Sequence, residues 1–379
     1  MSRRRLVHVI TGLANGGAEG VLFRLVAATR ERVDHRVVSL RDEGIYGPRL
    51  RELGIPVVAL GADSAVGAVR LLPRLWRRLR TWRPEVVQTW MYHADLAGGV
   101  AARLAGCRNV VWGIRHSNLD RDKWTTRRVA RCCATWSGII PRAIVCNSEV
   151  AAGIHQKLGY RSDRFRIIGN GIDLERFAPD PAAREGLRQE WRAAPGELLL
   201  GMVSRWNRQK DFGNLLAALR ILHDRGLSFR CVLTGTGMDG NNENLRTLIQ
   251  EKGLAAQVLL TGPRNDVPAV MNALDVHILS SRGEAFPNVV AESMACGTPC
   301  IVTDVGDAAQ IVGDPNRLVP VQDPERLAEA VWRLRGELAR DGRESIGARC
   351  RARMAERFGL ERMTQAYLSL WNELAGAAR

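Results

Sequence analysis

The sequence has no apolar run long enough to cross a membrane. Arginine or glycine interrupts its longest hydrophobic stretches well short of the roughly 18 residues that a spanning helix needs. Residues 2–10 have the order of charge and apolar residues seen in a signal peptide. They lack a small-residue cleavage site, and therefore predict a first β-strand instead. We expect a soluble protein without membrane-spanning segments.

The eight cysteines form no recognisable disulfide or metal-binding pattern. The sequence has no Cys-x-x-Cys pair and no cluster of cysteine and histidine with zinc spacing. Several of the cysteines lie in apolar segments, where a reduced thiol behaves as a small hydrophobic group. This usage favours reduced thiols in the cytoplasm and argues against a disulfide scaffold.

Lysine is scarce in the whole chain, and acidic residues are scarce in its first half. Lysine occurs at four positions, so arginine carries most of the formal net charge of +15. Residues 1–177 contain 30 basic and 15 acidic residues, whereas residues 178–379 contain 25 of each. The charge excess therefore belongs to the first half. This excess of positive charge is compatible with a nucleic-acid-binding protein. The sequence has no recognisable nucleic-acid recognition module, however, so we expect no nucleic-acid partner.

Short apolar segments alternate with helical patterns in two series. The first series contains seven expected strands, at residues 6–10, 36–40, 56–60, 85–90, 109–113, 143–146 and 166–168. The second contains five, at residues 198–203, 230–234, 258–261, 276–279 and 299–303. Continuous apolar strands that alternate with helices are typical of parallel sheets covered on both faces. The sequence thus predicts two doubly wound α/β domains, separated after residue 177 by a segment rich in glycine and proline.

The densest group of site-type residues spans 281–299 and begins where a strand of the second series ends. Pro287 suits the first position of a helix, whose free N–H groups attract an anion. Glu284 precedes this helix, and Glu292 lies inside it, one turn after Asn288. The two carboxylates are therefore placed to face one ligand at different points.

Two cations form a second group in the same half. Arg205 follows the strand at 198–203, and Lys210 precedes the next helix, an arrangement that suits a diphosphate without a metal ion. A solvated basic loop is the alternative interpretation. Residues 235–240 match the G-x-G-x-x-G pattern of dinucleotide sites, but no acidic residue ends the following strand, so a tight turn is the better interpretation.

With these motifs the chain resembles the retaining glycosyltransferases of family 4, which have the GT-B fold of two Rossmann-like domains facing across a cleft. The resemblance covers nearly the whole chain and is nearest to enzymes of O-antigen, capsule and exopolysaccharide assembly. It rests on Arg205 with Lys210, on Glu284 with Glu292, and on segments 16–19, 145–149, 168–173, 295–299 and 303–306.

The resemblance implies a role for each domain. Residues 1–177, with a returning helix at 360–379, would bind the acceptor, and residues 178–359 would bind a UDP- or GDP-linked sugar. Arg205 and Lys210 would hold the diphosphate, Glu292 the ribose, and Glu284 the sugar. The backbone expected to contact the sugar beside Glu284 belongs to Phe286, Pro287, Asn288 and Val289. Ala285 stands where the family commonly has glycine, which would tighten the sugar pocket.

Fewer residues of the first half point to a site. Gly16 and Gly17 open a helix after the first strand, and from the residues alone a plain turn and a ligand contact are equally supported. The resemblance favours contact with the donor. It also implies that His116, which follows a strand end, binds a hydroxyl of the donor sugar. His93 and Arg115, also after strand ends, are candidates for contact with the acceptor.

No metal or cofactor is expected. Asp120 and Asp122 form the Asp-x-Asp pattern that holds a metal in some transferases, but they lie among basic residues away from a strand end, as in a solvated loop. Two basic amphipathic stretches, 71–83 and 123–136, have the tryptophan and arginine content of a surface that contacts anionic lipid. A helix with its apolar side in the core is the alternative. We thus expect peripheral contact with the inner face of the cytoplasmic membrane.

The residues and the resemblance together predict a retaining hexosyltransferase-type enzyme (EC 2.4). Its expected catalytic residues are Glu284, His116, Arg205 and Lys210. Its acceptor would be a lipid-linked glycan intermediate of cell-surface polysaccharide or lipopolysaccharide. No residue stands out as a general base, so the leaving phosphate oxygen would accept the proton of the acceptor. The alternatives are a sugar-nucleotide epimerase on a similar scaffold and a basic nucleic-acid-binding α/β protein.

Overall fold

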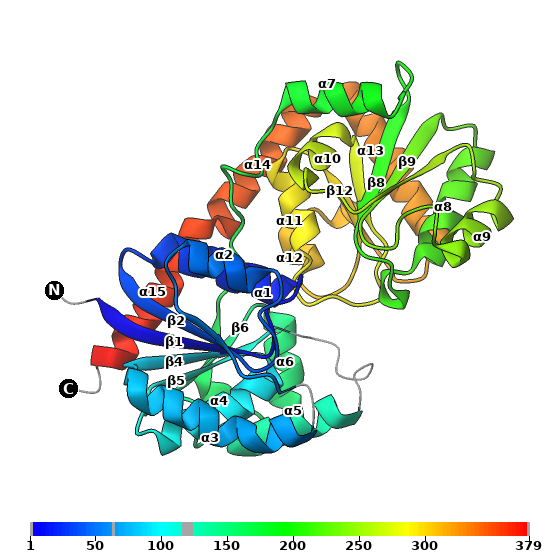
Figure 1. Ribbon diagram of the computed structural model, residues 1–379. Helices are drawn as coiled ribbons and strands as arrows, with labels where there is room; N and C mark the ends of the chain where they lie inside the picture. The colour runs from blue at the N-terminus through cyan, green and yellow to red at the C-terminus, as the bar shows by residue number, and fades with distance from the viewer. Residues whose placement is uncertain (1–2, 63–64, 116–123, 377–379) are drawn as a thin grey trace. The chain divides into compact units, whose positions relative to one another are not determined.

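The computed structural model describes residues 3–62, 65–115 and 124–376 of the chain. It divides the chain into two compact units, one made of Met1–Gly171 with Leu360–Arg379 and the other of Ile172–Gly359 (Figure 1). The chain therefore leaves the first unit within the turn-rich segment that separates the two series of strands, and its C-terminal segment returns to that unit. No helix in the described part of the chain has both the length and the apolar character that a membrane span requires.

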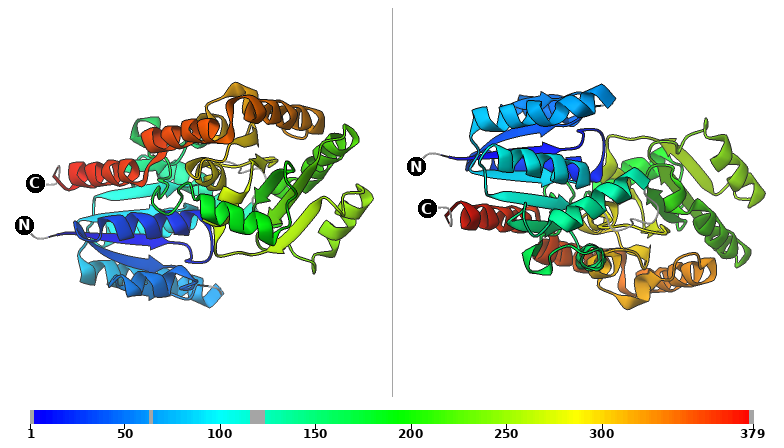
Figure 2. Two further views of the ribbon diagram at one scale, coloured as in Figure 1. Left: turned by 90° about the horizontal axis from the view of Figure 1, so that it is seen from above. Right: turned by 90° about the horizontal axis from the view of Figure 1, so that it is seen from below.

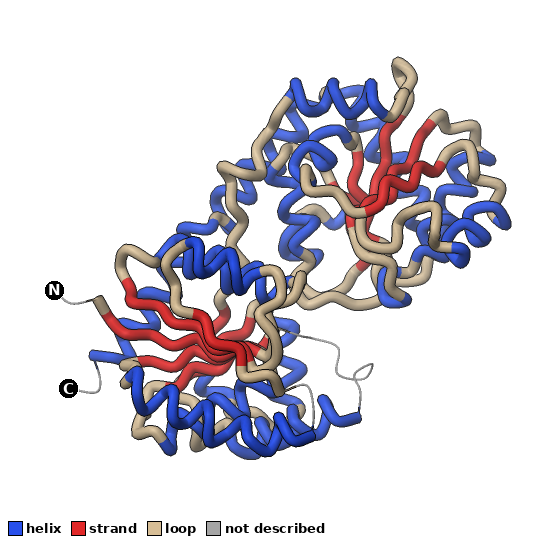
Figure 3. The backbone as a smooth tube through the Cα atoms, in the orientation of Figure 1, coloured by secondary structure: helices blue, strands red, loops and turns tan. Residues whose placement is uncertain are grey.

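The first unit contains a sheet of seven parallel strands in the order β3-β2-β1-β4-β5-β6-β7 (Figure 3). The strands are β1 (Arg4–Ile10), β2 (Val33–Ser39), β3 (Val57–Ala59), β4 (Val86–Trp90), β5 (Val110–Ile114), β6 (Ala143–Cys146) and β7 (Phe165–Ile167). β1 shows why both faces are covered. Leu6 and Ile10 belong to one apolar cluster and Val7 and Val9 to another, because successive side chains of a strand point to opposite faces.

Helices cover both faces of this sheet, as the continuous apolar strands predict (Figure 1). One face carries α1 (Gly17–Thr29), α2 (Tyr46–Glu52) and α15 (Leu360–Gly376). The other carries α3 (Ala65–Trp82), α4 (Tyr92–Leu104), α5 (Trp124–Trp136) and α6 (Glu149–Lys157). The helix α15, red in Figure 2, lies beside the strands of the first unit in both views. The expected return of the C-terminal helix to this unit is thus confirmed.

A buried polar chain lies beneath α15. The ring atoms His8 Nε2 and His35 Nδ1 are 3.0 Å apart, Thr29 Oγ1 lies 2.8 Å from His35 Nε2, and Trp90 Nε1 donates to His8 Nδ1 over 3.2 Å. Trp371 of α15 packs edge-on against both imidazoles. Burial lowers the pKa of His35 to about 3 and the pKa of His8 well below its usual value. Both histidines are therefore neutral components of the core.

The second unit contains six parallel strands in the order β10-β9-β8-β11-β12-β13. They are β8 (Leu198–Val203), β9 (Phe229–Thr234), β10 (Val258–Gly262), β11 (Val276–Leu279), β12 (Cys300–Thr303) and β13 (Leu318–Val319). One face packs against α7 (Pro181–Glu190), α10 (Val267–Ala273), α11 (Asn288–Ala295), α12 (Ala308–Val312) and α14 (Arg343–Phe358). The other packs against α8 (Phe212–Asp224), α9 (Glu243–Glu251) and α13 (Pro324–Asp341). The predicted fold class, two doubly wound parallel sheets, is confirmed.

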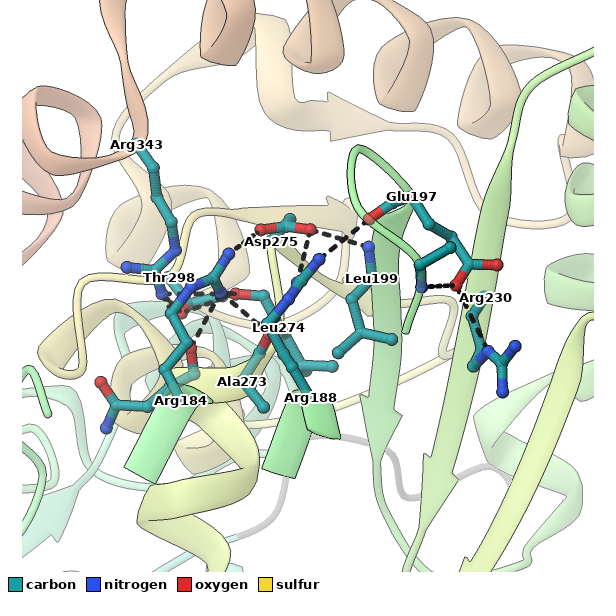
Figure 4. Close-up of polar contacts among 12 residues, drawn as sticks. Arg184, Arg188, Glu197, Leu199, Arg230, Ala273, Leu274, Asp275, Thr298 and Arg343 are labelled. Carbon is teal, nitrogen blue, oxygen red and sulfur yellow. Dashed lines mark hydrogen bonds and ion pairs between the residues drawn. The ribbon is translucent and has the colours of Figure 1, made fainter. Parts of the chain in front are cut away.

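A cluster of arginines around Asp275 fixes the amino-terminal end of β11 (Figure 4). The Asp275 carboxylate accepts hydrogen bonds from Arg184 at 2.5 Å, from Arg188 at 3.0 Å and from the backbone N–H of Leu199 at 2.7 Å. Arg343 of α14 donates to the Leu274 carbonyl nearby. Burial, together with the charge of Arg184, lowers the pKa of Arg343 to about 10. These contacts tie α7 and α14 to the amino ends of the strands and leave the carboxyl ends for other functions.

Candidate functional site

The carboxyl ends of the neighbouring strands β8 and β11 bring Lys210 and Glu284 together. The two residues are far apart in the sequence, but β8 and β11 are paired in the sheet. Lys210 Nζ lies 2.6 Å from Glu284 Oε1, and Ser281 Oγ donates to the same oxygen over 2.7 Å. Both charged side chains are less than one-fifth exposed. A shielded ion pair of this kind interacts more strongly than an exposed one, because less water screens it.

Three hydrogen bonds hold the backbone around this pair. Thr303 Oγ1 donates to the Ser281 carbonyl over 2.6 Å, and Gln209 Nε2 donates to the Gly283 carbonyl over 2.6 Å. Ser280 Oγ donates to the carbonyl of Lys210 over 2.8 Å. The loops after β8 and β11 are therefore cross-linked by side chains as well as by the ion pair.

A second ion pair joins the same two loops. Arg282 donates two hydrogen bonds to the Asp211 carboxylate, with N–O distances of 2.6 and 2.7 Å. Asp211 is buried, occupies the left-handed region with φ 52°, and precedes the first residue of α8. A bidentate pair fixes orientation as well as distance. Sequence reasoning assigned no role to this pair, because the fold alone brings its partners together.

Gly306 supports the loop from the β12 side. Its φ is +54°, and a Cβ atom at this position would lie 2.3 Å from the Ala285 carbonyl oxygen and 2.4 Å from that of Glu284. The backbone N–H of Asp307 donates to the Ala285 carbonyl over 2.9 Å. Only glycine allows the two backbones to approach this closely.

The helix α11 begins one residue later than expected. Pro287 is its N-cap, and Asn288 rather than Pro287 is the first helical residue. The side chain of Phe286 is buried and packs edge-on against Phe358, with ring centroids 5.7 Å apart. Glu292 lies one turn after Asn288 and is half-buried. Glu284 before the helix and Glu292 within it are thus placed as the sequence predicts, and Val289 lies in the first turn.

Arg205 leaves β8 and is exposed. The neighbouring turn contains Gly235, whose φ is +136° and whose added Cβ atom would lie 1.9 Å from the Ser204 carbonyl oxygen. The backbone N–H of Trp206 donates to the Thr236 carbonyl over 2.8 Å. The glycine pattern at 235–240 is therefore a tight turn that passes close to the β8 loop, as predicted.

His277 lies on β11 beneath the ion pair and is fully buried. Its Nε2 atom accepts a hydrogen bond from the Val203 N–H over 3.3 Å. Burial, and secondarily the charge of Lys210, lowers its pKa to about 3. Because a base with so low a pKa binds a proton poorly near neutral pH, His277 is unsuited to general-base catalysis.

The first-unit candidates occupy several different elements. Gly16 is the N-cap of α1 and Gly17 its first residue, while His93 is exposed near the start of α4. Arg115 donates to Asn170 Oδ1 over 2.6 Å and to the Tyr367 hydroxyl, and its guanidinium lies over the ring of Trp90. Arg115 therefore joins the end of β5 to α15, a structural role that the sequence did not suggest.

Some of the expected residues lie outside the described part of the chain. His116, Asp120 and Asp122 belong to this group. Within the described residues, no group of three or more histidine, cysteine, aspartate or glutamate side chains is arranged to hold a metal ion. The roles of Gly16, Gly17, His93 and His116 stay predictions.

Asp95 is a buried carboxyl group that sequence reasoning missed. It lies in the first turn of α4, where its Oδ1 atom accepts hydrogen bonds from Thr89 Oγ1 over 2.5 Å and from the Gly113 N–H over 3.1 Å. It therefore ties the carboxyl ends of β4 and β5 together. Burial raises its pKa to about 8, although both hydrogen bonds and the charge of Arg115 oppose the shift. The carboxyl group is mainly protonated at neutral pH.

The raised pKa of Asp95 predicts a measurable pH dependence of stability. The folded protein keeps the proton between about pH 4 and 8, whereas the unfolded chain releases it, so the stability contributed by this proton falls as pH rises. The loss approaches about 1.4 kcal/mol per pH unit. Asp95→Asn removes the titration. The unfolding free energies of both proteins are measured in urea at pH 5, 6.5 and 8. As pH rises, the unfolding free energy of the wild type should fall relative to that of the variant. Parallel profiles would contradict a protonated Asp95.

Two family models match the chain, one in each unit. Residues 15–176 match the model described as Glycosyltransferase Family 4, and residues 197–336 match the model described as Glycosyl transferases group 1. The first match ends at residue 176, shortly after the first unit ends at Gly171, and the second match lies within the second unit. They include every predicted site residue in the described part of the chain.

Individual relatives are similar over most of the chain. The GDP-mannose-dependent alpha-(1-6)-phosphatidylinositol dimannoside mannosyltransferase of Mycobacterium tuberculosis (strain ATCC 25177 / H37Ra) is 27% identical over 389 residues, covering 91% of this chain and 98% of its own. The UDP-Gal:alpha-D-GlcNAc-diphosphoundecaprenol alpha-1,3-galactosyltransferase of Escherichia coli is 27% identical over 253 residues, covering 64% and 63%. The crystal structure of Anabaena Alr3699/HepE in complex with UDP and glucose superposes with a TM-score of 0.85 at 21% identity, covering 98% and 100%.

Proposed function

We propose that the protein, which belongs to glycosyltransferase family 4 and has the GT-B fold, transfers a sugar from a nucleoside-diphosphate sugar to an acceptor hydroxyl. The proposed transfer retains the anomeric configuration of the sugar. The observation that carries the proposal is the shielded pair of Lys210 and Glu284 at the carboxyl ends of β8 and β11. Ligands of open α/β sheets bind at this end of the strands.

Lys210, held in this pair, provides the positive charge that the departure of a diphosphate requires. As the glycosidic bond breaks, negative charge accumulates on the diphosphate, and a preorganised cation stabilises it without rearrangement. Glu284 and the surrounding hydrogen bonds hold Lys210 in position before the donor binds. Arg205 and the positive N-terminal end of α11 would also stabilise the same diphosphate. These charges support transfer without a metal ion.

The roles of the two glutamates follow from their different places. Glu284 would bind hydroxyls of the sugar and stabilise the positive charge that develops on it, and Glu292 would bind the ribose. The neutral His277 is unsuited to act as a base. We therefore propose that the leaving phosphate oxygen accepts the proton of the attacking hydroxyl on the same face of the sugar.

The relatives support UDP or GDP as the donor nucleotide and a lipid-linked acceptor. One structural neighbour is complexed with UDP and glucose, and one relative is described as GDP-mannose-dependent. Another relative is described as acting on a sugar linked to diphosphoundecaprenol. We propose a lipid-linked glycan intermediate of cell-surface polysaccharide as the acceptor, modified at the cytoplasmic face of the membrane.

A donor screen tests the proposal. Thermal unfolding is measured with UDP, GDP and their common sugar conjugates in the presence of EDTA, with Lys210→Ala as the control. One nucleotide series should raise the unfolding temperature of the wild type and have little effect on the variant. Incubation of the stabilising donor without acceptor then separates transfer from epimerisation. An epimerase would convert the donor under these conditions, and that result would refute the proposal.

The helix α5 supports contact with an anionic membrane. Trp124 is 61% exposed, and the guanidinium of Arg128 lies 4.5 Å from its ring centroid. Trp136 at the other end of the helix is 48% exposed. In α3, by contrast, Leu75 and Leu79 are fully buried, so its apolar side belongs to the core. Tryptophan beside arginine on an exposed helix suits the interface of anionic lipid.

Substitution of the α5 arginines is expected to release the protein from anionic vesicles. Each basic residue near such a surface contributes about 1 kcal/mol, so Arg127→Gln with Arg128→Gln and Arg131→Gln should weaken binding roughly 100-fold. Flotation with phosphatidylglycerol vesicles at low and high salt measures this, and salt should weaken binding of the wild type. The matched control removes the same charge from α13 through Arg326→Gln, Arg333→Gln and Arg335→Gln. Equal effects of the two triple variants would contradict a specific role of α5.

A further inference from the structure

A cavity of about 420 Å³ lies in the first unit between the edge strand β3 and the helix α3. Its walls are residues 58–60 on one side and Arg74, Arg77, Arg78 and Thr81 on the other. Among the residues that the structure describes, none of those assigned to sugar transfer lines it. The cavity is therefore separate from the donor residues at β8 and β11.

Three arginines line this cavity, and none of the described residues in its walls is acidic. Arg74, Arg77 and Arg78 recur at the three- and four-residue spacing that places side chains on one side of a helix. Arg74 Nη1 donates to the Leu60 carbonyl over 3.3 Å, which holds this guanidinium at the wall. Within the described residues, no carboxylate forms an ion pair with any of the three. Neighbouring like charges on a helix destabilise it unless a counter-charge is present.

The size and charge of the cavity restrict its ligand. A volume of about 420 Å³ lies within the range of small-molecule binding pockets, so the cavity has room for a phosphate that carries a substituent. Three neighbouring positive charges favour a ligand that carries more than one negative charge. Guanidinium groups match the geometry of phosphate oxygens in bidentate contacts. Val58 and Leu60 add apolar wall next to the charged side.

We propose that this cavity binds a phosphate group that carries a further substituent, either a soluble diphosphate or the headgroup of an anionic phospholipid. The arginines of α3 bind the phosphate oxygens, and the β3 side contacts the attached group. The proposal does not depend on the donor site, since no residue is shared between the two.

The test uses the full-length chain with Arg205→Ala and Lys210→Ala, which removes the proposed diphosphate cations of the second unit. Into this background are placed Arg77→Gln with Arg78→Gln, or, as a control of equal charge, Arg80→Gln in the last turn of α3 with Arg83→Gln just after it. Binding of inorganic pyrophosphate is measured by titration calorimetry. Binding to vesicles with and without phosphatidylglycerol is measured by flotation, and thermal unfolding verifies that each variant folds.

The cavity variant should lose at least tenfold in affinity for pyrophosphate, for phosphatidylglycerol vesicles, or for both, while the control changes less than twofold. A loss confined to pyrophosphate identifies a soluble diphosphate as the ligand, and a loss of vesicle binding identifies the headgroup. If the cavity variant and the control bind both probes equally, or if neither probe binds the parent protein, the proposal is overturned. Failure of the donor screen, in contrast, leaves this result unaffected.

Discussion

Lys210→Ala is expected to lower kcat/KM for sugar transfer by about 10²–10³, the loss that follows removal of one preorganised charge from a developing anion. The substitution removes the amine that lies 2.6 Å from Glu284 Oε1 and keeps the hydrogen bond that Ser281 Oγ donates to the same oxygen. Glu284→Ala should cause a loss of similar size. Because the two side chains are in direct contact, the double variant should lose far less than the sum of the two single effects on the free-energy scale.

Steady-state kinetics with a saturating acceptor measures these effects. Lys157→Ala is a suitable control, because it removes one of the four lysines from an exposed position at the end of α6. The control should retain wild-type activity and stability. Near-normal transfer by both Lys210→Ala and Glu284→Ala would show that the catalytic site lies elsewhere.

Gly306→Ala is expected to destabilise the second unit and to impair transfer at the same time. An alanine in the left-handed region costs about 1–2 kcal/mol, and forcing a methyl group into a filled space adds about 1–3 kcal/mol. The added Cβ atom would meet the carbonyl oxygens of Ala285 and Glu284, which must then move. We therefore expect a loss of about 2–5 kcal/mol in unfolding free energy. Activity should fall even at temperatures below the unfolding transition, because the carboxylate of Glu284 is displaced.

Gly226→Ala provides the matched control. Gly226 lies just after the C-terminus of α8 in the same unit and also has a positive φ, +78°, but nothing lies within 4 Å of the position that its Cβ atom would occupy. This variant should show the backbone cost alone and retain normal transfer. If both alanine variants have the same stability and activity, the close approach at Gly306 does not position Glu284.

The sequence predicts the sheets well because parallel strands buried on both faces are continuous apolar segments. The strand at 276–279, for example, coincides with β11. It missed β13, which has two residues and therefore no detectable pattern. It placed Pro287 one position too far into α11, since proline is compatible with both the N-cap and the first turn of a helix.

The candidate site was predictable where charge and motif coincide. Lys210 and Glu284 stand out in the sequence because each lies in a loop between a strand and the next helix, and the pairing of β8 with β11 then brings them together. Asp95 gave no signal, because an aspartate in the first turn of a helix is ordinary and only burial makes it unusual. Gly306 belongs to the segment 303–306, which contributes to the family resemblance. Its contact with the Glu284 loop, however, depends on tertiary structure and could not be predicted from the sequence.

Proton NMR of the product shows whether the enzyme transfers a sugar from a nucleoside-diphosphate donor with retention of configuration. The donor identified by the thermal screen is incubated with a lipid-linked acceptor in EDTA, and the anomeric coupling of the new glycoside is compared with that of the donor. The wild type should form a product with the same anomeric configuration as the donor, and Lys210→Ala should form far less of it. A product of inverted configuration, or conversion of the donor in the absence of acceptor, would contradict the proposed retaining transfer.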